Sequence, residues 1–510
     1  MRNPARPHWS TTARDENTLE TLVARLKHAA THDVLTGLPH RGLLLERLEQ
    51  ELARDPQAVA RIAVLFVDLD HFKLVNDSLG HSSGDAVLCE MARRVRGCVS
   101  KGDTVSRFGG DELVILHTGA SDLSGAAIGA RILAAVSEPI LIAGREVVMS
   151  ASIGIAQCSA REKSAEQLIR EADTALYAAK NRGRGRMAHF NEELHTLVTR
   201  RVQIESDLRV ALREGQIQVQ YQPQVNLKTG QMVGTEALAR WHHPGQGMIS
   251  PAEFIPVAED CGLIVALGRQ VLHQACRQLT QWSQLAPGRR LSMTVNLSPR
   301  QLEDPGFTRE LVEVLAATGI DPTALCLELT EGALMSATGD TVAVLNAIHD
   351  MGIYIAIDDF GTRHSSLARL RDLPAEVLKI DRSFIDGLGR ESDDTAIVSA
   401  ILSLAYTMGK HVIAEGVETR EQAVALQRMG CEVAQGYLLS RPVDPEKIAP
   451  LLGTTLWQSR VEPGRPAMPA ARQARVRSGS RYLIDEFLFH IGAPMCADRP
   501  ADLPKAGRPP

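Results

Sequence analysis

The chain has 510 residues, which is more than one ordinary domain needs, so two or three domains are expected. Its 44% hydrophobic and 23% charged residues are typical of a globular protein. A formal net charge of only -5 implies no strong electrostatic steering toward nucleic acid, and we expect no nucleic-acid partner. We also expect no membrane span, because no apolar run is long enough. The eight cysteines form no C-x-x-C pair, which favours a reducing cytoplasm.

The chain opens with a polar stretch, residues 1–16, that we expect to be disordered. Residues 17–30 have a helical pattern with an apolar seam at spacings of three and four, formed by Leu19, Leu22, Leu26 and Ala29. This linker helix could pair with the same helix of a second subunit or pack on its own domain, and both interpretations stay open.

Helical and strand patterns alternate through residues 31–190, which predicts an α/β domain. A charged helix over 191–215, broken at Gly215, is expected to connect it to a second domain at 216–452. After Gly453 the sequence is rich in Pro, Arg and Ala with little periodicity, so we expect a tail of low order over 453–510.

Acidic residues mark a candidate site in the first domain. Asp68 ends a β-branched strand, and Gly109-Gly110 between two apolar runs favours a tight hairpin with Asp111 and Glu112 at its tip. If the tip lies beside Asp68, three acids can hold Mg²⁺ together with a triphosphate. The glycines allow a ligand to approach the backbone closely.

The motifs around this site resemble the GGDEF family of diguanylate cyclases. The matches occur in family order and cover about residues 31–190: Asp33-x-Leu35-Thr36-Gly37-Leu38-Pro39, Asp68-x-Asp70-His71-Phe72-Lys73-x-Val75-Asn76-Asp77, Gly80-His81-x-x-Gly84-Asp85, Gly109-Gly110-Asp111-Glu112 and Ser152-Ile153-Gly154-Ile155-Ala156. The resemblance implies an antiparallel sheet flanked by helices that makes cyclic di-GMP from two GTP molecules.

The resemblance also assigns roles to individual residues. It implies that Asp68 and Glu112 bind Mg²⁺ with GTP, and that Asp111 helps to activate the attacking 3′-hydroxyl. Asn76 and Asp85 would read the guanine edge, to which an amide and a carboxylate can hydrogen-bond. Two basic residues, expected one helical turn apart, resemble the family's phosphate contacts; they are Lys180 and Arg184.

Three positions of this domain depart from the family pattern. Leu113 stands where the motif has Phe, an apolar exchange that should have little effect. His40 stands where the family usually has Asn. The family's inhibitory Arg-x-x-Asp reads Ser100-Lys101-Gly102-Asp103 here, so the arginine is missing.

The second domain contains a row of short apolar runs that each end in a carboxylate or an amide. Such runs, separated by helical stretches, predict buried parallel strands whose polar ends meet at the mouth of a (β/α)8 TIM-type barrel. Acids gathered at one mouth repel each other unless a divalent metal balances them, so the pattern predicts a metal site for an anionic substrate. The strand-end residues are Glu236, Asn296, Glu328, Asp358, Asp359, Asp381, Glu415 and Gln435.

These strand ends, with their neighbours, resemble the EAL family of cyclic di-GMP phosphodiesterases over about residues 200–450. The matching segments are Tyr221-Gln222-Pro223, Glu236-Ala237-Leu238-Ala239-Arg240-Trp241, Val295-Asn296-Leu297-Ser298, Glu328-Leu329-Thr330-Glu331, Asp358-Asp359-Phe360-Gly361, Leu378-Lys379-Ile380-Asp381, Glu415-Gly416-Val417-Glu418 and Gln435-Gly436-Tyr437. The resemblance implies hydrolysis of cyclic di-GMP with two Mg²⁺ or Mn²⁺ ions, for which carboxylate and amide oxygens are suitable ligands.

The family assigns most strand-end residues to the two metals. One ion would be held by Glu236, Asn296, Glu328 and Asp358, and the other by Asp359 with Asp358 and either Glu415 or Gln435. Lys379 would orient or deprotonate the attacking water, with a pKa lowered by the metals. Arg240 suits a phosphate contact, and Glu331 would steady the loop after Asp359. The remaining nucleotide contacts implied by the resemblance are Gln222, Leu238 and Asp381.

The loop after Asp359 departs from the family, because Arg363 replaces a glycine and His364 replaces an aromatic residue. We expect activity to survive with altered metal affinity. Three functions stay open: a working phosphodiesterase whose first domain cyclises or senses GTP, a cyclase with an idle barrel, and a non-enzymatic nucleotide receptor. Cyclising two GTP molecules would need two facing half-sites, so a homodimer is expected.

Overall fold

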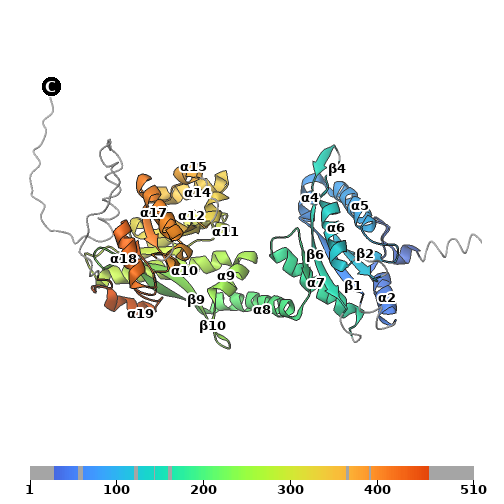
Figure 1. The fold of residues 1–510 in the computed structure, drawn as a ribbon, viewed down its shortest axis with the longest axis horizontal. Coiled ribbons are helices and arrows are strands. Elements are labelled where there is room, and N and C mark those ends of the chain that lie inside the picture. Colours follow the sequence, from blue (N-terminus) through green and yellow to red (C-terminus); the bar gives the residue numbers. More distant parts are fainter. Residues whose placement is uncertain are drawn as a thin grey trace, which may run out of the picture. The chain divides into compact units, whose positions relative to one another are not determined.

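The computed structural model describes residues 28–54, 61–119, 124–142, 144–158, 163–362, 367–389 and 392–458. The expectations for residues 1–16, for the seam from Leu19 to Leu26, for Arg363 and His364, and for 459–510 lie outside the described residues. Contacts divide the chain into two compact units, Met1–Val202 and Gln203–Pro510. Figure 1 labels their elements.

The first unit is built on a five-stranded sheet with the strand order β2-β3-β1-β6-β7. The central strand β1 pairs antiparallel with β3 and β6, and only β7 at the edge is parallel to its neighbour. The strands are β1 (Ala63–Asp70), β2 (Thr104–Gly109), β3 (Glu112–His117), β6 (Ser150–Gln157) and β7 (Met187–His189), and a separate hairpin is formed by β4 (Ile140–Ile142) and β5 (Arg145–Val147).

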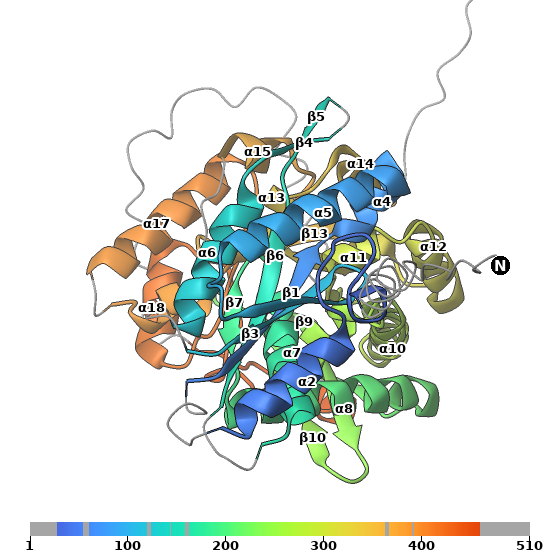
Figure 2. The same ribbon diagram turned by 90° about the vertical axis from the view of Figure 1, so that its right-hand side faces the viewer.

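Helices cover both faces of this sheet because β1 is apolar on both faces. Leu65 and Val67 pack with α5 and α6, whereas Val64 and Phe66 pack with α2 and α7. Figure 2 shows the two helical layers with the sheet between them. The helices are α2 (Arg41–Leu52), α4 (Phe72–Leu79), α5 (His81–Gly97), α6 (Gly125–Ser137) and α7 (Ala165–Asn181). The expected sheet flanked by helices is confirmed.

The second unit is a closed barrel of eight strands that follows helix α8 (Glu192–Glu214). Its strand order is β9-β11-β12-β13-β14-β15-β16-β8, and the pairing of β8 with β9 closes it. The strands are β8 (Ile217–Asn226), β9 (Met232–His243), β11 (Ser292–Asn296), β12 (Leu325–Thr330), β13 (Tyr354–Phe360), β14 (Val377–Ile380), β15 (His411–Ala414) and β16 (Val433–Ala434), and β10 (Gly247–Ile249) extends β9.

The barrel expectation is confirmed, with one strand reversed. β8 runs antiparallel to both β9 and β16, while the pairings from β9 through β11 to β16 are parallel. The cause is the short connection to β9, where the backbone N–H groups of Lys228 and Thr229 donate to Oδ1 of Asn226. So short a turn joins antiparallel neighbours, because a parallel pair needs a crossover.

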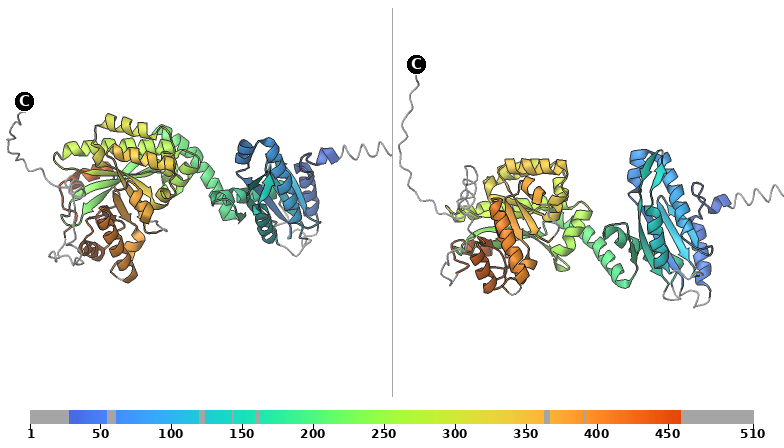
Figure 3. Two further views of the ribbon diagram at one scale, coloured as in Figure 1. Left: turned by 90° about the horizontal axis from the view of Figure 1, so that it is seen from above. Right: turned by 45° about the horizontal axis from the view of Figure 1, so that its top comes forward.

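Helices surround the barrel strands (Figure 3). They are α9 (Pro251–Asp260), α10 (Ile264–Leu285), α11 (Pro299–Leu302), α12 (Phe307–Thr318), α13 (Glu331–Met335), α14 (Gly339–Asp350), α15 (Leu367–Asp372), α16 (Arg382–Asp386), α17 (Ser392–Thr407), α18 (Arg420–Met429) and α19 (Pro445–Ile448), with 3-10 turns at Pro322–Ala324 and Ala449–Leu451. Across the described residues, no helix combines the length and apolarity that a bilayer crossing requires.

Candidate functional site

The barrel mouth is organised around Lys379, whose side chain is 1% exposed at the end of β14. Its Nζ contacts Glu328 Oε1 and lies 2.5 Å from Glu415 Oε1. Glu236 Oε2 and Asp358 Oδ1 follow at 3.5 and 3.6 Å. These acids come from four different strands or the residues directly after them, and parallel pairing brings these strands to one mouth. The structure therefore brings together five of the predicted site residues.

One cation does not satisfy this ring. Glu328 Oε2 and Asp358 Oδ1 are buried and accept no hydrogen bond, although buried polar atoms normally have a partner. One oxygen from each of Glu328, Asp358 and Glu415 lies within 4.8 Å of the other two. Burial raises the pKa of Glu415 to about 7, with further repulsion from Glu236 and Asp358. Carboxylate oxygens this close, two of them without hydrogen bonds, fit a divalent metal.

The charge state of Lys379 follows from the same contacts. Burial alone would lower the pKa of its amine, but the surrounding Glu236, Glu328 and Glu415 raise that pKa well above its usual value. The chain without metal therefore holds Lys379 as an ammonium. The expected neutral amine would require metals to bind the carboxylates that now pair with Lys379.

Two amide side chains also bind the Glu236 carboxylate. Asn296 Nδ2 donates to Glu236 Oε1 at 2.7 Å, and Gln435 Nε2 donates to Glu236 Oε2 at 2.6 Å. Gln435 also donates to Gln222 Oε1 at 3.0 Å and accepts from Gln224 Nε2 at 3.2 Å. These bonds fix the Glu236 carboxylate. Sequence reasoning missed Gln224, although its place two residues after Gln222 puts both side chains on one face of β8.

The end of β13 and the turn after it connect the ring to Glu331, the first residue of α13. Asp359 has a left-handed backbone with φ 54°, which is uncommon for a residue other than glycine. Its carbonyl accepts from Thr362, and Gly361 N donates to the buried Glu331 carboxylate at 3.0 Å. Burial raises the pKa of Asp359, and the nearby Asp358 and Asp381 raise it further. Glu331 thus contacts the loop in the way that the family resemblance implied.

The remaining predicted residues of the barrel are Asp381, Arg240 and Leu238. Asp381 caps α16 by accepting from Ser383 N at 3.0 Å. Arg240 donates from Nε to Gln220 Oε1 at 2.9 Å, and burial lowers its pKa. Leu238 is half-buried and pairs with Gln220 across β8 and β9.

The hairpin of the first unit differs from its expected form. β2 ends at Gly109 and β3 begins at Glu112, so the turn residues are Gly110 and Asp111, not the two glycines. Gly110 has φ 44°, which glycine adopts at low cost. Glu112 consequently lies in the strand and not at the tip. The register allows this because the ladder is irregular between Arg107 and Gly109.

Glu112 and Asp68 occupy directly opposed positions of β3 and β1. Burial raises the pKa of both carboxyl groups, and the negative charge of Asp111 raises both further. Lys180 Nζ compensates by pairing with Asp68 Oδ2 at 2.7 Å. Three predicted residues therefore meet at this sheet end, and Asp111 lies next to them in the turn.

Asp70 and Arg184 do not join this group. Asp70 accepts from Ser150, Ser152 and the backbone N–H of Gly185, so it fastens neighbouring segments. α7 ends at Asn181, and Arg184 lies beyond it, exposed and with φ 55°. The prediction that Arg184 stands one helical turn from Lys180 is therefore wrong, because glycines flank it and the helix has already ended.

Asn76 and Asp85 lie on adjacent helices. The Asn76 side chain packs so closely on α5 that a Cβ at Gly84 would lie 1.9 Å from its Oδ1. Asp85 follows Gly84 directly and is exposed. The glycine thus gives the Asn76 side chain room to lie against α5.

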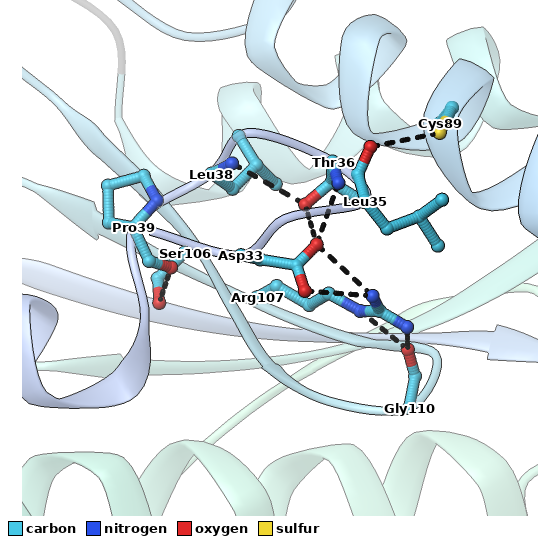
Figure 4. A network of polar contacts seen from close by, with 9 residues as sticks. All are labelled: Asp33, Leu35, Thr36, Leu38, Pro39, Cys89, Ser106, Arg107 and Gly110. Atoms are coloured by element: carbon cyan, nitrogen blue, oxygen red, sulfur yellow. Dashed lines mark hydrogen bonds and ion pairs between the residues drawn. The ribbon is translucent and has the colours of Figure 1, made fainter. Parts of the chain in front are cut away.

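A polar network that the sequence did not predict anchors the hairpin (Figure 4). Arg107 donates to both carboxylate oxygens of Asp33 at 3.1 Å and, from Nη2, to the carbonyl of Gly110 at 2.8 Å. Asp33 also accepts from the backbone N–H and the hydroxyl of Thr36. Nothing local signals a pair 74 residues apart, although the polar loop could have suggested an Asx turn at Asp33.

Asp103 is the residue of the inhibitory Arg-x-x-Asp motif that this chain retains, and it is 2% exposed. Its Oδ1 contacts His117 Nδ1 at 2.9 Å and accepts from Thr118 N at 3.2 Å, while Oδ2 accepts from Ser100 N at 2.9 Å. Both oxygens are therefore engaged within the domain.

Comparisons with known proteins cover both units. Residues 30–186 match the family described as diguanylate cyclase, GGDEF domain, and residues 205–442 match the EAL domain family. The bifunctional diguanylate cyclase/cyclic di-GMP phosphodiesterase MucR of Pseudomonas aeruginosa is 42% identical over 435 residues, which is 84% of this chain and 63% of that protein. Rv1354c of Mycobacterium tuberculosis is 37% identical over 432 residues, 84% of this chain and 69% of that protein.

A solved structure described as PaMucR phosphodiesterase in complex with c-di-GMP is 44% identical and covers 48% of this chain and 99% of its own, with a TM-score of 0.47. The chain spans 63% and 53% of the lengths of two of the curated relatives it matches. Both family matches, and the match that covers 69% of Rv1354c, agree with the geometry of the two sites. The chain belongs to the family of proteins that join a GGDEF domain to an EAL domain.

Proposed function

We propose that the barrel hydrolyses cyclic di-GMP to the linear dinucleotide 5′-pGpG. The observation that carries this proposal is the Lys379-centred ring, in which Glu328 and Asp358 each keep a buried oxygen without a hydrogen bond. Mg²⁺ or Mn²⁺ bound there would supply Lewis-acid stabilisation of a phosphodiester and activation of a water. The residues to hold the ions are Glu236, Asn296, Glu328, Asp358, Asp359, Glu415 and Gln435.

The chain's own residues then prepare the reaction. Gln435 and Asn296 fix the Glu236 carboxylate by hydrogen bonds. Lys379 lies at the centre of the ring, within reach of four carboxylates, where it can hold a proton close to the attacked phosphate. Arg240 offers its remaining guanidinium N–H groups to a phosphate oxygen, and Gln222, Leu238 and Asp381 would contact the nucleotide.

We further propose that the GGDEF domain condenses two GTP molecules into cyclic di-GMP, with the release of two pyrophosphates. The opposed carboxylates of Asp68 and Glu112 supply the ligands for Mg²⁺ bound with GTP, and Lys180 can exchange its contact with Asp68 for a phosphate. Asp111 at the turn would receive the proton of the attacking 3′-hydroxyl, and Asn76 and Asp85 would read guanine. Because one such site holds one GTP, the active form would be a homodimer. GTP as a substrate would support a cytoplasmic location.

The decisive test incubates the purified chain with cyclic di-GMP under Mg²⁺ or Mn²⁺ and follows 5′-pGpG. The Glu236→Ala variant should hydrolyse cyclic di-GMP roughly a hundredfold more slowly, since it loses a proposed metal ligand at the reacting centre. Glu446→Ala, an exposed glutamate on α19, is the matched control and should behave as wild type. Equal rates in wild type and Glu236→Ala would reject this site. A parallel incubation with GTP tests the cyclase and separates the working phosphodiesterase from the idle-barrel and receptor alternatives.

A further inference from the structure

The first unit contains a polar cavity of about 450 Å³ between the loop 32–39, α2, α5 and the start of β2. Three arginines and a histidine line it, namely Arg47, Arg93, Arg96 and His32. No acidic residue is among the lining residues. The volume is in the range of small-molecule sites, and the lining favours an anion.

Two of the arginines are held in place without being neutralised. Arg47 Nη1 donates to Thr104 Oγ1 at 2.9 Å, and Arg96 Nη1 donates to the carbonyl of Asp103 at 3.1 Å. The two guanidiniums are therefore anchored to consecutive residues at the start of β2. Within the described part of the chain, neither has a carboxylate at ion-pair distance. A guanidinium has five N–H donors, so each keeps donors for a ligand.

The other two basic side chains differ from this pair. Arg93 is matched by Glu90, to which it donates at 2.6 and 2.7 Å. Burial lowers the pKa of His32, and the positive charges of His28 and Arg47 lower it further. The uncompensated charge of the cavity therefore belongs to Arg47 and Arg96.

We propose that this cavity binds a phosphate-bearing anion between Arg47 and Arg96. Arginine forks match phosphate oxygens in pairs, and two forks fixed at neighbouring residues can hold one phosphoryl or pyrophosphoryl group. The site is separate from the proposed GTP site, because neither Asp68, Glu112 nor Lys180 lines the cavity. The inference does not depend on cyclase activity.

The position of the cavity connects it to the hairpin. Thr36 lines the cavity and donates to Asp33, and Asp33 accepts from Arg107, which reaches the Gly110 carbonyl (Figure 4). A bound anion would therefore lie against the loop that anchors the hairpin.

The test uses isothermal titration calorimetry of the full chain with inorganic pyrophosphate as the probe, in EDTA at constant chloride. We expect one saturable site per chain. Arg47→Gln and Arg96→Gln should each weaken it by roughly tenfold, the effect of losing a charge-assisted hydrogen bond at an accessible site. Arg54→Gln removes an exposed arginine that pairs with Glu51 and should leave the affinity unchanged, as should Lys180→Gln.

Pyrophosphate bound equally well by wild type and by the Arg47→Gln/Arg96→Gln double variant would overturn the proposal. So would binding that disappears in Lys180→Gln, because the probe would then occupy the GTP site, or the absence of saturable binding. Both cavity arginines are exposed, so the variants should fold, and circular dichroism checks this. If the double variant does not fold, the two single variants decide.

Discussion

The ammonium of Lys379 lies 2.5 Å from Oε1 of Glu415, so the barrel carries its own cation at the centre of the carboxylate ring. Glu328, Glu236 and Asp358 share this cation. The lysine thus offsets part of the repulsion that a metal would otherwise have to balance, and the ring can fold before metal binds. It also places a proton donor where the proposed hydrolysis takes place.

Lys379→Met should separate these two roles. Removing one partner of a buried ion pair typically lowers the free energy of unfolding by about 3–5 kcal/mol, and loss of a proton-transfer group slows the chemical step by roughly a hundredfold or more. We therefore expect a lower melting temperature in EDTA, a larger rise with Mn²⁺ than in wild type, and almost no hydrolysis of cyclic di-GMP. Lys447→Met, which removes an exposed lysine paired with Asp444, is the control. Wild-type stability of Lys379→Met in EDTA would show that the lysine does not support the ring.

Arg107→Gln should impair the GGDEF domain alone. The variant loses the paired bonds to Asp33 and the contact to the Gly110 carbonyl, so the hairpin that carries Asp111 is no longer fixed. Because small misplacements of reacting groups are costly, GTP turnover should fall by roughly tenfold to a hundredfold. Hydrolysis of cyclic di-GMP by the same sample is the internal control and should not change. Asp33→Asn should have the same effect; unchanged turnover in both variants would rule out this role.

Local patterns predicted the barrel mouth well. Each apolar run ending in an acid predicts one strand and the acid it carries, and parallel pairing then brings Glu236, Glu328, Asp358 and Glu415 around Lys379. The reversed direction of β8 could not be predicted in this way, because an apolar or alternating pattern does not tell in which direction a strand runs relative to its neighbours. Only the short turn after Asn226 carries that signal.

Long-range polar pairs explain most of what the sequence missed. Arg107 and Asp33 belong to segments 74 residues apart, and no periodicity relates them. The hairpin was misassigned for a different reason: two adjacent glycines favour a turn between themselves, but the pairing of Glu112 with Asp68 shifts the turn by one residue.

Asp103 should stabilise the fold and should play no part in inhibition of the GGDEF domain by cyclic di-GMP. The missing arginine at Ser100 removes a bidentate contact, and the Asp103 carboxylate is fully engaged by His117, Thr118 and Ser100. We expect little inhibition of GTP turnover by added cyclic di-GMP in the Glu236→Ala background, which cannot clear its product. Asp103→Ala should lower the free energy of unfolding by about 1–3 kcal/mol, the usual effect of breaking buried hydrogen bonds, and leave that inhibition as it was.

Lys101→Ala is the matched control for this experiment, since its exposed side chain lies between the two positions. It should change neither stability nor inhibition. Strong inhibition that Asp103→Ala abolishes would contradict the prediction, because it would mean that the carboxylate leaves its internal partners to bind product.

His411 should make the barrel sensitive to acid. Burial at the start of β15 lowers the pKa of its imidazole to about 4, against about 6.5 in an unfolded chain. Below pH 6.5 the unfolded chain therefore binds a proton that the folded barrel resists. The contribution of His411 to stability is complete above pH 6.5 and is lost as the pH falls toward 4, by at most about 3 kcal/mol.

His411→Gln isolates this effect, because glutamine does not titrate while other buried groups, such as Glu376, whose pKa burial raises, titrate in both proteins. Unfolding can be followed by tryptophan fluorescence, since Trp241 and Trp282 are buried in the barrel. The free energy of unfolding of wild type, measured relative to that of the variant, should fall by about 3 kcal/mol between pH 7 and pH 4. A gap that is independent of pH would mean that His411 is not held neutral, and that another group causes any acid lability of the barrel.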